Sequence, residues 1–158
     1  MGAKWTAAVE SSASLGAGAA IAAVFPPASR TLSLRRLIVG GRGASSPGQL
    51  SANVTYTQSA GTAGNTESLQ PIGVGQYLGN GNSFGSAHSQ FSADPTFGGN
   101  PLYELSFNSE GPSEKLEWEY GDFVCQFGGG GANGIMLYTI DAAPSGFLYT
   151  VTFEVEAI

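Results

Sequence analysis

A serine and the chain's single histidine lie close together in the segment NGNSFGSAHS, which covers residues 80–89. Gly81, Ser83 and Gly85 form a G-x-S-x-G pattern, and His88 follows the serine by five residues. In α/β-hydrolases this pattern holds a nucleophilic serine on a tight turn between a strand and a helix. A nearby histidine would then act as the general base. Acyl transfer is therefore the first chemistry to consider.

The surroundings of Ser83 favour a loop over a nucleophile. No amphipathic helix follows the pattern, and no histidine comes after His88, whereas the hydrolase histidine lies late in the chain, behind the acid. A chain this rich in glycine and serine also forms the pattern by chance. We predict that the protein is not an enzyme and that residues 80–89 form the tip of a long loop. We expect Phe84 to be buried there against a neighbouring molecule.

The remaining candidate groups also favour structure over chemistry. Glu117 and Glu119 share one face of a predicted strand, about 6.5–7 Å apart, a separation found in glycosidases. They flank Trp118 on the face opposite the apolar residues, so a solvated or interface face is the preferred interpretation. One histidine, one cysteine and the lack of an Asp-x-Asp loop predict no metal site and no cofactor. Cys125 is predicted to be a small buried core residue.

The charged residues are few and unevenly placed. The net charge is −6 and 11% of residues are charged, which argues against a nucleic-acid partner because phosphate binding needs clustered cations. Four arginines lie within thirteen positions, and most acids follow later, so the two zones can match within the chain or between subunits. We predict that the arginine zone faces an acidic partner surface. The predicted partner-interface residues are Arg30, Arg35, Arg36, Arg42, Phe84 and Trp118.

Length and hydropathy predict a single domain, residues 1–158, made in the cytoplasm without a signal peptide. A chain of 158 residues can bury a sizeable core without disulfides. The start lacks the apolar stretch of a signal peptide. The longest apolar run, residues 17–25, is far short of the ~20 residues that span a bilayer, so we predict no membrane partner.

The elements that must position these residues are strands. Period-two alternation is clearest in FLYTVTFEVE, residues 147–156, which predicts a half-buried antiparallel strand. GIMLYTI, residues 134–140, is apolar on both faces and predicts a central strand, joined to the last one as a hairpin by DAAPSG. Further strands are predicted from alternation around residues 50–56, 103–107 and 116–120, with weaker candidates at 5–11 and 17–25.

The arginine-rich segment RTLSLRRLIVG, residues 30–40, changes phase at Arg35 and Arg36. Leu32 and Leu34 alternate on one face before the pair, and Leu37 continues after it out of phase. One extra residue there predicts a β-bulge that re-aims the arginines.

Seven or eight short strands separated by Gly, Pro, Ser and Asn turns predict an all-β, antiparallel, jelly-roll-like β-sandwich. Residues 58–101 depart from the pattern, because they are rich in Gly and Asn and show little alternation. We expect a long Gly/Asn-rich central loop there, either an insertion, a loop held by a partner, or a region with one hidden strand. ESLQPIGVGQYL, residues 67–78, is the preferred position for that strand.

The order of these segments resembles a group of small β-sandwich virion proteins of tailed bacteriophages. The matching segments are Pro27–Arg30 before an arginine-rich strand, Asp94–Thr96 before a middle strand, Leu116–Tyr120, and Thr152–Glu154 in the terminal strand. The loop VCQFGGGGAN and the long central region depart from the group's pattern. The resemblance covers most of the chain and implies a virion component without catalytic residues.

The resemblance implies a capsid decoration or cement protein on the capsid surface that binds the major capsid protein and copies of itself. Because closed cyclic symmetry is common in such assemblies, we expect a homotrimer. The alternative is a tail or fibre module that binds a host-surface glycan through exposed aromatic side chains such as Trp118 and Tyr120, or Tyr77 and Phe84.

Overall fold

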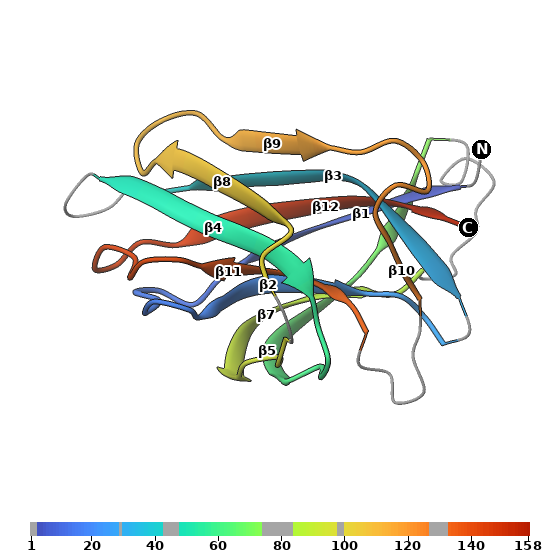
Figure 1. Ribbon diagram of the computed structural model, residues 1–158, viewed down its shortest axis with the longest axis horizontal. Coiled ribbons are helices and arrows are strands. Elements are labelled where there is room, and N and C mark those ends of the chain that lie inside the picture. The colour runs from blue at the N-terminus through green and yellow to red at the C-terminus, as the bar shows by residue number, and fades with distance from the viewer. Residues whose placement is uncertain (1–2, 29, 43–47, 74–83, 98–99, 127–132) are drawn as a thin grey trace.

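The protein is a β-sandwich, as predicted from its alternation (Figure 1). The computed structural model describes residues 3–28, 30–42, 48–73, 84–97, 100–126 and 133–158. Within these ranges the chain forms two six-stranded antiparallel sheets and no helix, hence no helix that could cross a membrane. The strands are β1 (Lys4–Glu10), β2 (Ala20–Phe25), β3 (Thr31–Gly41), β4 (Gln49–Tyr56), β5 (Thr62–Ser68), β6 (Gln70–Ile72), β7 (Ser86–Ala93), β8 (Tyr103–Asn108), β9 (Glu114–Glu117), β10 (Val124–Gln126), β11 (Ile135–Thr139) and β12 (Tyr149–Ala157).

The strand order is that of a jelly roll with three added strands. One sheet runs β10-β3-β12-β1-β6, with β9 on the same edge of β3 as β10, and the other runs β5-β7-β2-β11-β4-β8. Without β5, β6 and β7, one sheet has the order β1-β12-β3, followed by β9 and β10, which lie one after the other along β3. The other sheet has the order β2-β11-β4-β8. A jelly roll has this alternation of strands between its two sheets.

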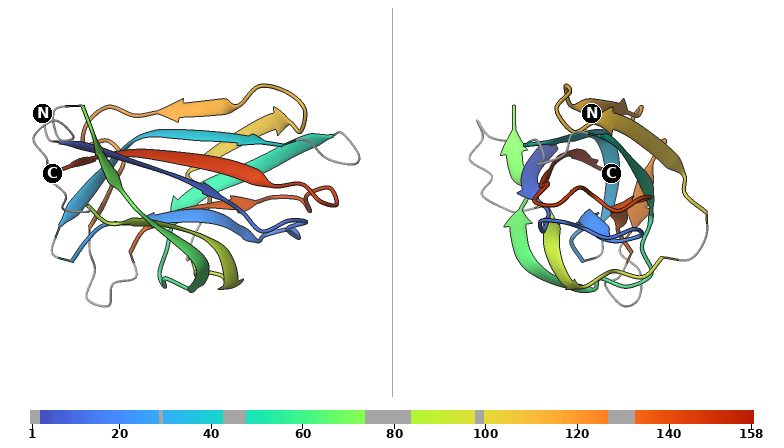
Figure 2. Two further views of the ribbon diagram at one scale, coloured as in Figure 1. Left: turned by 180° about the vertical axis from the view of Figure 1, so that it is seen from behind. Right: turned by 90° about the vertical axis from the view of Figure 1, so that its left-hand side faces the viewer.

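The central region is not one continuous loop, and it contains more strands than the single hidden one that its sequence allowed. Residues 58–101 contain β5, β6 and β7, which extend both sheets, and Figure 2 shows the segment that carries β5 and β6 passing from one sheet to the other. β6 falls within the predicted residues 67–78, of which 74–78 lie outside the described residues. The alternation was absent because β5 is exposed along most of its length and β7 faces the core with Ala87 and Ser89.

The predicted β-bulge in β3 is confirmed. Glu154 of β12 pairs with Arg36, whereas the next residue, Val155, pairs with Leu34, so Arg35 is the additional residue. The bulge lets leucines on both sides of the arginine pair reach the core, because Leu34 and Leu37 are both fully buried.

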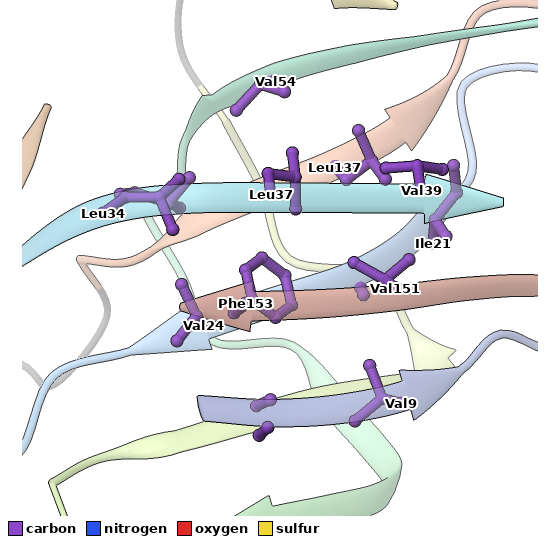
Figure 3. Packing of buried hydrophobic residues seen from close by; sticks show 14 of the residues in the cluster. Val9, Ile21, Val24, Leu34, Leu37, Val39, Val54, Leu137, Val151 and Phe153 are labelled. Atoms are coloured by element: carbon purple, nitrogen blue, oxygen red, sulfur yellow. The ribbon is translucent and has the colours of Figure 1, made fainter. Parts of the chain in front are cut away.

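The core lies between the sheets and is filled by the apolar sides of β12, β3, β2 and β11 (Figure 3). The alternating residues of β12, among them Val151 and Phe153, are almost completely buried. Each such side chain contributes roughly 1.5–3 kcal/mol of hydrophobic stabilisation. All five residues of β11 are buried, which confirms the prediction of a central strand.

The predicted hairpin between β11 and β12 is wrong, because these strands belong to opposite sheets. Their connection, residues 140–148, crosses one end of the sandwich and bonds to the loop between β1 and β2. The Ala143 amide donates to the Leu15 carbonyl at 2.7 Å, and the Gly146 amide donates to Ser14 Oγ at 2.7 Å. Two consecutive apolar strands can pair in one sheet as a hairpin, or they can face each other from opposite sheets. Alternation of apolar residues is the same in both arrangements, so it did not distinguish them.

Candidate functional site

The arginine strand meets its acidic partners within the chain. Arg36 lies between Glu154 of β12 and Glu117 of β9 in the strand register, so all three side chains project from the outer face of one sheet. Arg36 Nε donates to Glu117 Oε1 at 2.8 Å, and Arg36 Nη1 lies 3.2 Å from Glu154 Oε2. Lys115 Nζ adds a contact to Glu117 at 3.4 Å. The hydrogen bond from Arg36 holds the pKa of the Glu117 carboxyl below its ordinary value.

Arg35, the bulged residue, makes a different kind of contact. Its guanidinium pairs with Glu156, whose side chain is completely buried, and its Nε donates to the Trp118 carbonyl at 3.1 Å. The Arg35 carbonyl in turn accepts from the Trp118 amide at 3.0 Å. Glu156 Oε1 has no hydrogen-bond partner among the described residues. Arg35 is thus the counter-ion of a buried carboxylate, and it fixes the chain at the end of β9.

A hollow of about 400 Å³ opens beside these pairs. Three cationic and four acidic side chains line it together with Trp118, so their charges nearly cancel. A surface of this kind suits hydrogen bonding with a partner better than attraction of a strongly charged one. The lining residues are Lys4, Arg35, Arg36, Glu117, Trp118, Glu119, Asp122 and Glu154.

Trp118 is half-buried and belongs to an aromatic cluster. Its ring centroid lies 5.0 Å from that of Tyr103 and 5.1 Å from that of Phe123, and the Tyr56 ring also contacts Phe123. Tyr103 and Tyr56 remain partly exposed. The cluster joins β4 and β8 of one sheet to the chain after β9, so Trp118 has a packing role in addition to any contact with a partner.

Phe84 and Arg30 lie together, and both contact residues of the same chain. The Phe84 ring is 2% exposed and stacks on Trp5 at a centroid distance of 4.5 Å, and the Arg30 guanidinium carbon lies 5.8 Å from the Phe84 centroid. The expectation that a neighbouring molecule buries Phe84 is therefore corrected: residues of the same chain already cover it. Trp5 and Phe84 are far apart in the sequence, so no sequence pattern predicted that their rings would stack.

The last predicted interface arginine, Arg42, is also paired within the chain. Its guanidinium contacts the Glu10 carboxylate of β1. The structure thus brings Arg35, Arg36 and Trp118 together at one site and places Arg30 with Phe84 and Arg42 with Glu10 elsewhere. The sequence left open whether the arginines pair with acids of the same chain or of another subunit. Arg35, Arg36 and Arg42 pair with acids of the same chain.

The histidine lies on a strand and bonds a different serine from the one in the motif. Gly81 and Ser83 lie outside the described residues. His88 belongs to β7, and its Nε2 lies 2.8 Å from Ser86 Oγ, two residues away on the same face. The imidazole packs against Phe25 at 4.8 Å, and its burial lowers the pKa of His88. Residues 86–89 are therefore strand rather than the loop tip predicted for them.

The other titratable candidates behave as structural groups. Cys125 is buried, as predicted, and burial raises the pKa of its thiol to about 12. Glu117 is an exposed, ion-paired carboxylate, as described above. Within the described ranges, no group of three or more acidic, histidine or cysteine side chains is arranged to hold a metal ion.

Comparison with known proteins identifies no family for the chain. No protein-family model matches it, and no curated protein matches it with significance.

Proposed function

We propose that this protein is a structural virion protein of a tailed bacteriophage, a capsid decoration or cement protein that binds and stabilises the major capsid lattice. The observation that carries the proposal is where the resembling segments lie. Pro27 and Arg30 precede the arginine-rich β3, and the Arg30 amide donates to the Pro27 carbonyl at 3.2 Å. Asp94–Thr96 links β7 to β8, and Thr152–Glu154 lies in β12. These positions support the proposal, whereas in the fourth segment, Leu116–Tyr120, the strand β9 ends at Glu117 and the predicted strand does not continue to Tyr120.

The charge arrangement supports a binding role on a lattice. Three of the four interface arginines are neutralised by acids of the same chain, so the folded surface carries small polar groups and few free cations. Glu119 and Asp122, which line the charged hollow, have no ion pair in the part of the chain that the structure describes. We place the contact with the major capsid protein at this hollow and expect the protein to act as a homotrimer.

The cement role is tested on heads with and without the protein. Heads that lack it should release DNA at a lower temperature than complete heads, and adding the purified protein should restore the release temperature. A Glu119→Lys, Asp122→Lys double variant should bind heads at least ten-fold more weakly, because the charge of the hollow changes by four. Glu110→Lys, in an exposed turn, is the matched control. Equal robustness of heads with and without the protein would reject cementing.

A tail or fibre module that binds host glycan is the second candidate, and one observation favours it. Tyr120 is 47% exposed and follows Glu119, one of the acidic residues that line the hollow, in the chain. An exposed ring can stack on a sugar while nearby carboxylates accept hydrogen bonds from the sugar hydroxyls. Copy number distinguishes the candidates, since hundreds of copies on each head indicate cement and a few at the tail indicate adsorption. A glycan array in which the wild type and Tyr120→Ala bind alike would remove the support for this role.

A further inference from the structure

A groove opens where the β5–β6 chain separates from the edge of β1. β6 pairs with β1 only over residues Lys4–Thr6. The chain then turns at the fully buried Leu69, and β5 pairs with β7 of the other sheet. The two strands diverge from that turn, as the path of this segment in Figure 2 shows. The remaining length of β1 therefore has a strand on one side only.

The backbone hydrogen bonds of β1 show which residues point into the groove. The Ser11 amide donates to the Tyr149 carbonyl at 3.0 Å, and the Ala157 amide donates to the Ala3 carbonyl at 3.3 Å. In an antiparallel pair the backbone groups of alternate residues point to opposite edges. Odd-numbered residues of β1 thus bond to β12, and even-numbered residues point to the edge that β6 occupies.

Ala8 and Glu10 are the even-numbered residues of β1 beyond the reach of β6. In the register of β6 they would face residues 68 and 66, but these residues pair with β7 instead. The N–H and C=O groups of Ala8 and Glu10 have no strand partner among the described residues. Ala8 is exposed and small, so nothing bulky protects this edge from another strand.

The walls of the groove combine small residues with polar side chains and carry an uncompensated negative charge. The groove has a volume of about 480 Å³ and is lined by β1 together with Asn65, Glu67, Gln90 and Thr150. Glu10 is paired with Arg42, whereas the exposed Glu67 has no ion pair in the described ranges. The amides of Asn65 and Gln90 offer both donors and acceptors to a bound group.

We propose that this groove accepts an extended, cationic peptide segment of a partner protein, which pairs with β1 as an added strand. Its backbone bonds the free N–H and C=O groups of Ala8 and Glu10, continuing the line of β6. A Lys or Arg side chain of the segment meets Glu67. Main-chain bonds supply the affinity in such strand addition, and side chains supply the specificity.

Two observations favour a peptide over a small polar ligand such as a sugar. The free groups on β1 are two donors and two acceptors in strand spacing, which is the complement of another strand. The part of the described chain that surrounds the groove also offers it no aromatic ring on which a sugar could stack. This inference does not rest on the virion assignment, because it concerns the purified protein, whereas that assignment is tested on particles.

The test is amide hydrogen exchange by NMR on the full chain. The probe is a capped pentapeptide of alternating lysine and valine, and the control peptide has every backbone nitrogen methylated. In the free protein the amides of Ala8 and Glu10 should exchange much faster than those of Ala7 and Val9. At about 1 mM probe the exchange of Ala8 and Glu10 should slow at least ten-fold, with no effect of the methylated peptide. Unchanged exchange of both amides would overturn the proposal.

Two variants test the two parts of the contact. Ala8→Pro removes an edge donor without removing a bond to β12, so it should abolish probe binding while Ala8→Thr, which keeps the donor, should not. Glu67→Lys should weaken binding about ten-fold at low salt, and Glu110→Lys should leave it unchanged. Binding that is equal in Ala8→Pro and wild type would reject strand addition. A sugar panel that shifts the Asn65 and Gln90 signals, without any effect of the probe, would also reject it.

Discussion

At the scale of single residues, Arg35 and Arg36 are neighbours in sequence with opposite environments. Arg36 forms exposed pairs, which solvent screens and which therefore contribute little stability. Arg35 neutralises Glu156, a carboxylate with no exposed surface. Loss of a partner from a buried pair leaves a desolvated charge, and that is the costly case.

We therefore expect Arg35→Ala to lower the free energy of unfolding by about 3–5 kcal/mol. Arg36→Ala is the matched control and should cost much less. Urea denaturation of both variants at neutral pH measures the difference. Replacing both members of the buried pair, as Arg35→Met with Glu156→Met, should recover much of the loss. Equal effects of Arg35→Ala and Arg36→Ala would show that Glu156 does not depend on Arg35.

At the scale of elements, the end of β3 is fitted against the β11–β12 connection. A Cβ atom on Gly41 would lie 2.0 Å from Phe147 Cζ, and the Phe147 ring is fully buried. Only a residue without a side chain allows β3 and this ring to approach so closely. The strand and the connection are thus joined through one glycine.

Gly41→Ala should destabilise the protein by about 1–3 kcal/mol, because the buried ring must move to make room for the methyl group. Gly16→Ala is the control, since a Cβ there meets nothing within 4 Å. Thermal unfolding of the two variants provides the measurement. A Gly41→Ala protein as stable as the Gly16→Ala protein would mean that the ring adapts at no cost.

Strands that alternate in polarity, and the continuous apolar run of β11, were predictable from sequence, whereas polar edge strands were not. β12, β4 and β8 alternate strongly, and the phase change at Arg35 located the bulge. β5 and β7 escaped prediction because an edge strand can be polar on both faces. At the candidate site, sequence identified the arginines and Trp118 but not their partners, because ion pairs between residues 81 to 121 positions apart depend on strand register. Ser86, the partner of His88, lies outside the G-x-S-x-G pattern, so the motif did not indicate it.

At the scale of the whole molecule, stability should fall as the solution becomes alkaline. Burial raises the pKa of both the Cys125 thiol and the Tyr149 phenol to about 12. In the unfolded chain these groups lose their protons near 9 and 10, while the folded protein retains them to about 12. The unfolded state therefore binds fewer protons between pH 9 and 12, and the free energy of unfolding decreases with pH there.

Urea midpoints at pH 7, 9 and 10.5 should show this decrease, and Cys125→Ala should have a shallower one. The comparison concerns the change with pH, since the variant also loses packing at every pH. Below pH 9 the thiol should cause no difference between the two proteins in how the urea midpoint changes with pH. A wild-type midpoint that stays constant up to pH 10.5 would contradict the prediction.

The pairing of β1 with β12 also bears on how the chain reaches its fold. These strands lie side by side at the centre of one sheet, although they are far apart in sequence. Thr6 Oγ1, for example, donates to the carbonyl of Phe153, 147 positions away. During synthesis β1 leaves the ribosome long before its partner exists, and β3 waits for the same strand. Such non-local topology makes folding slow compared with helical domains of similar size. Unpaired β1 and β3 are thus open to association with other nascent chains until β12 separates them.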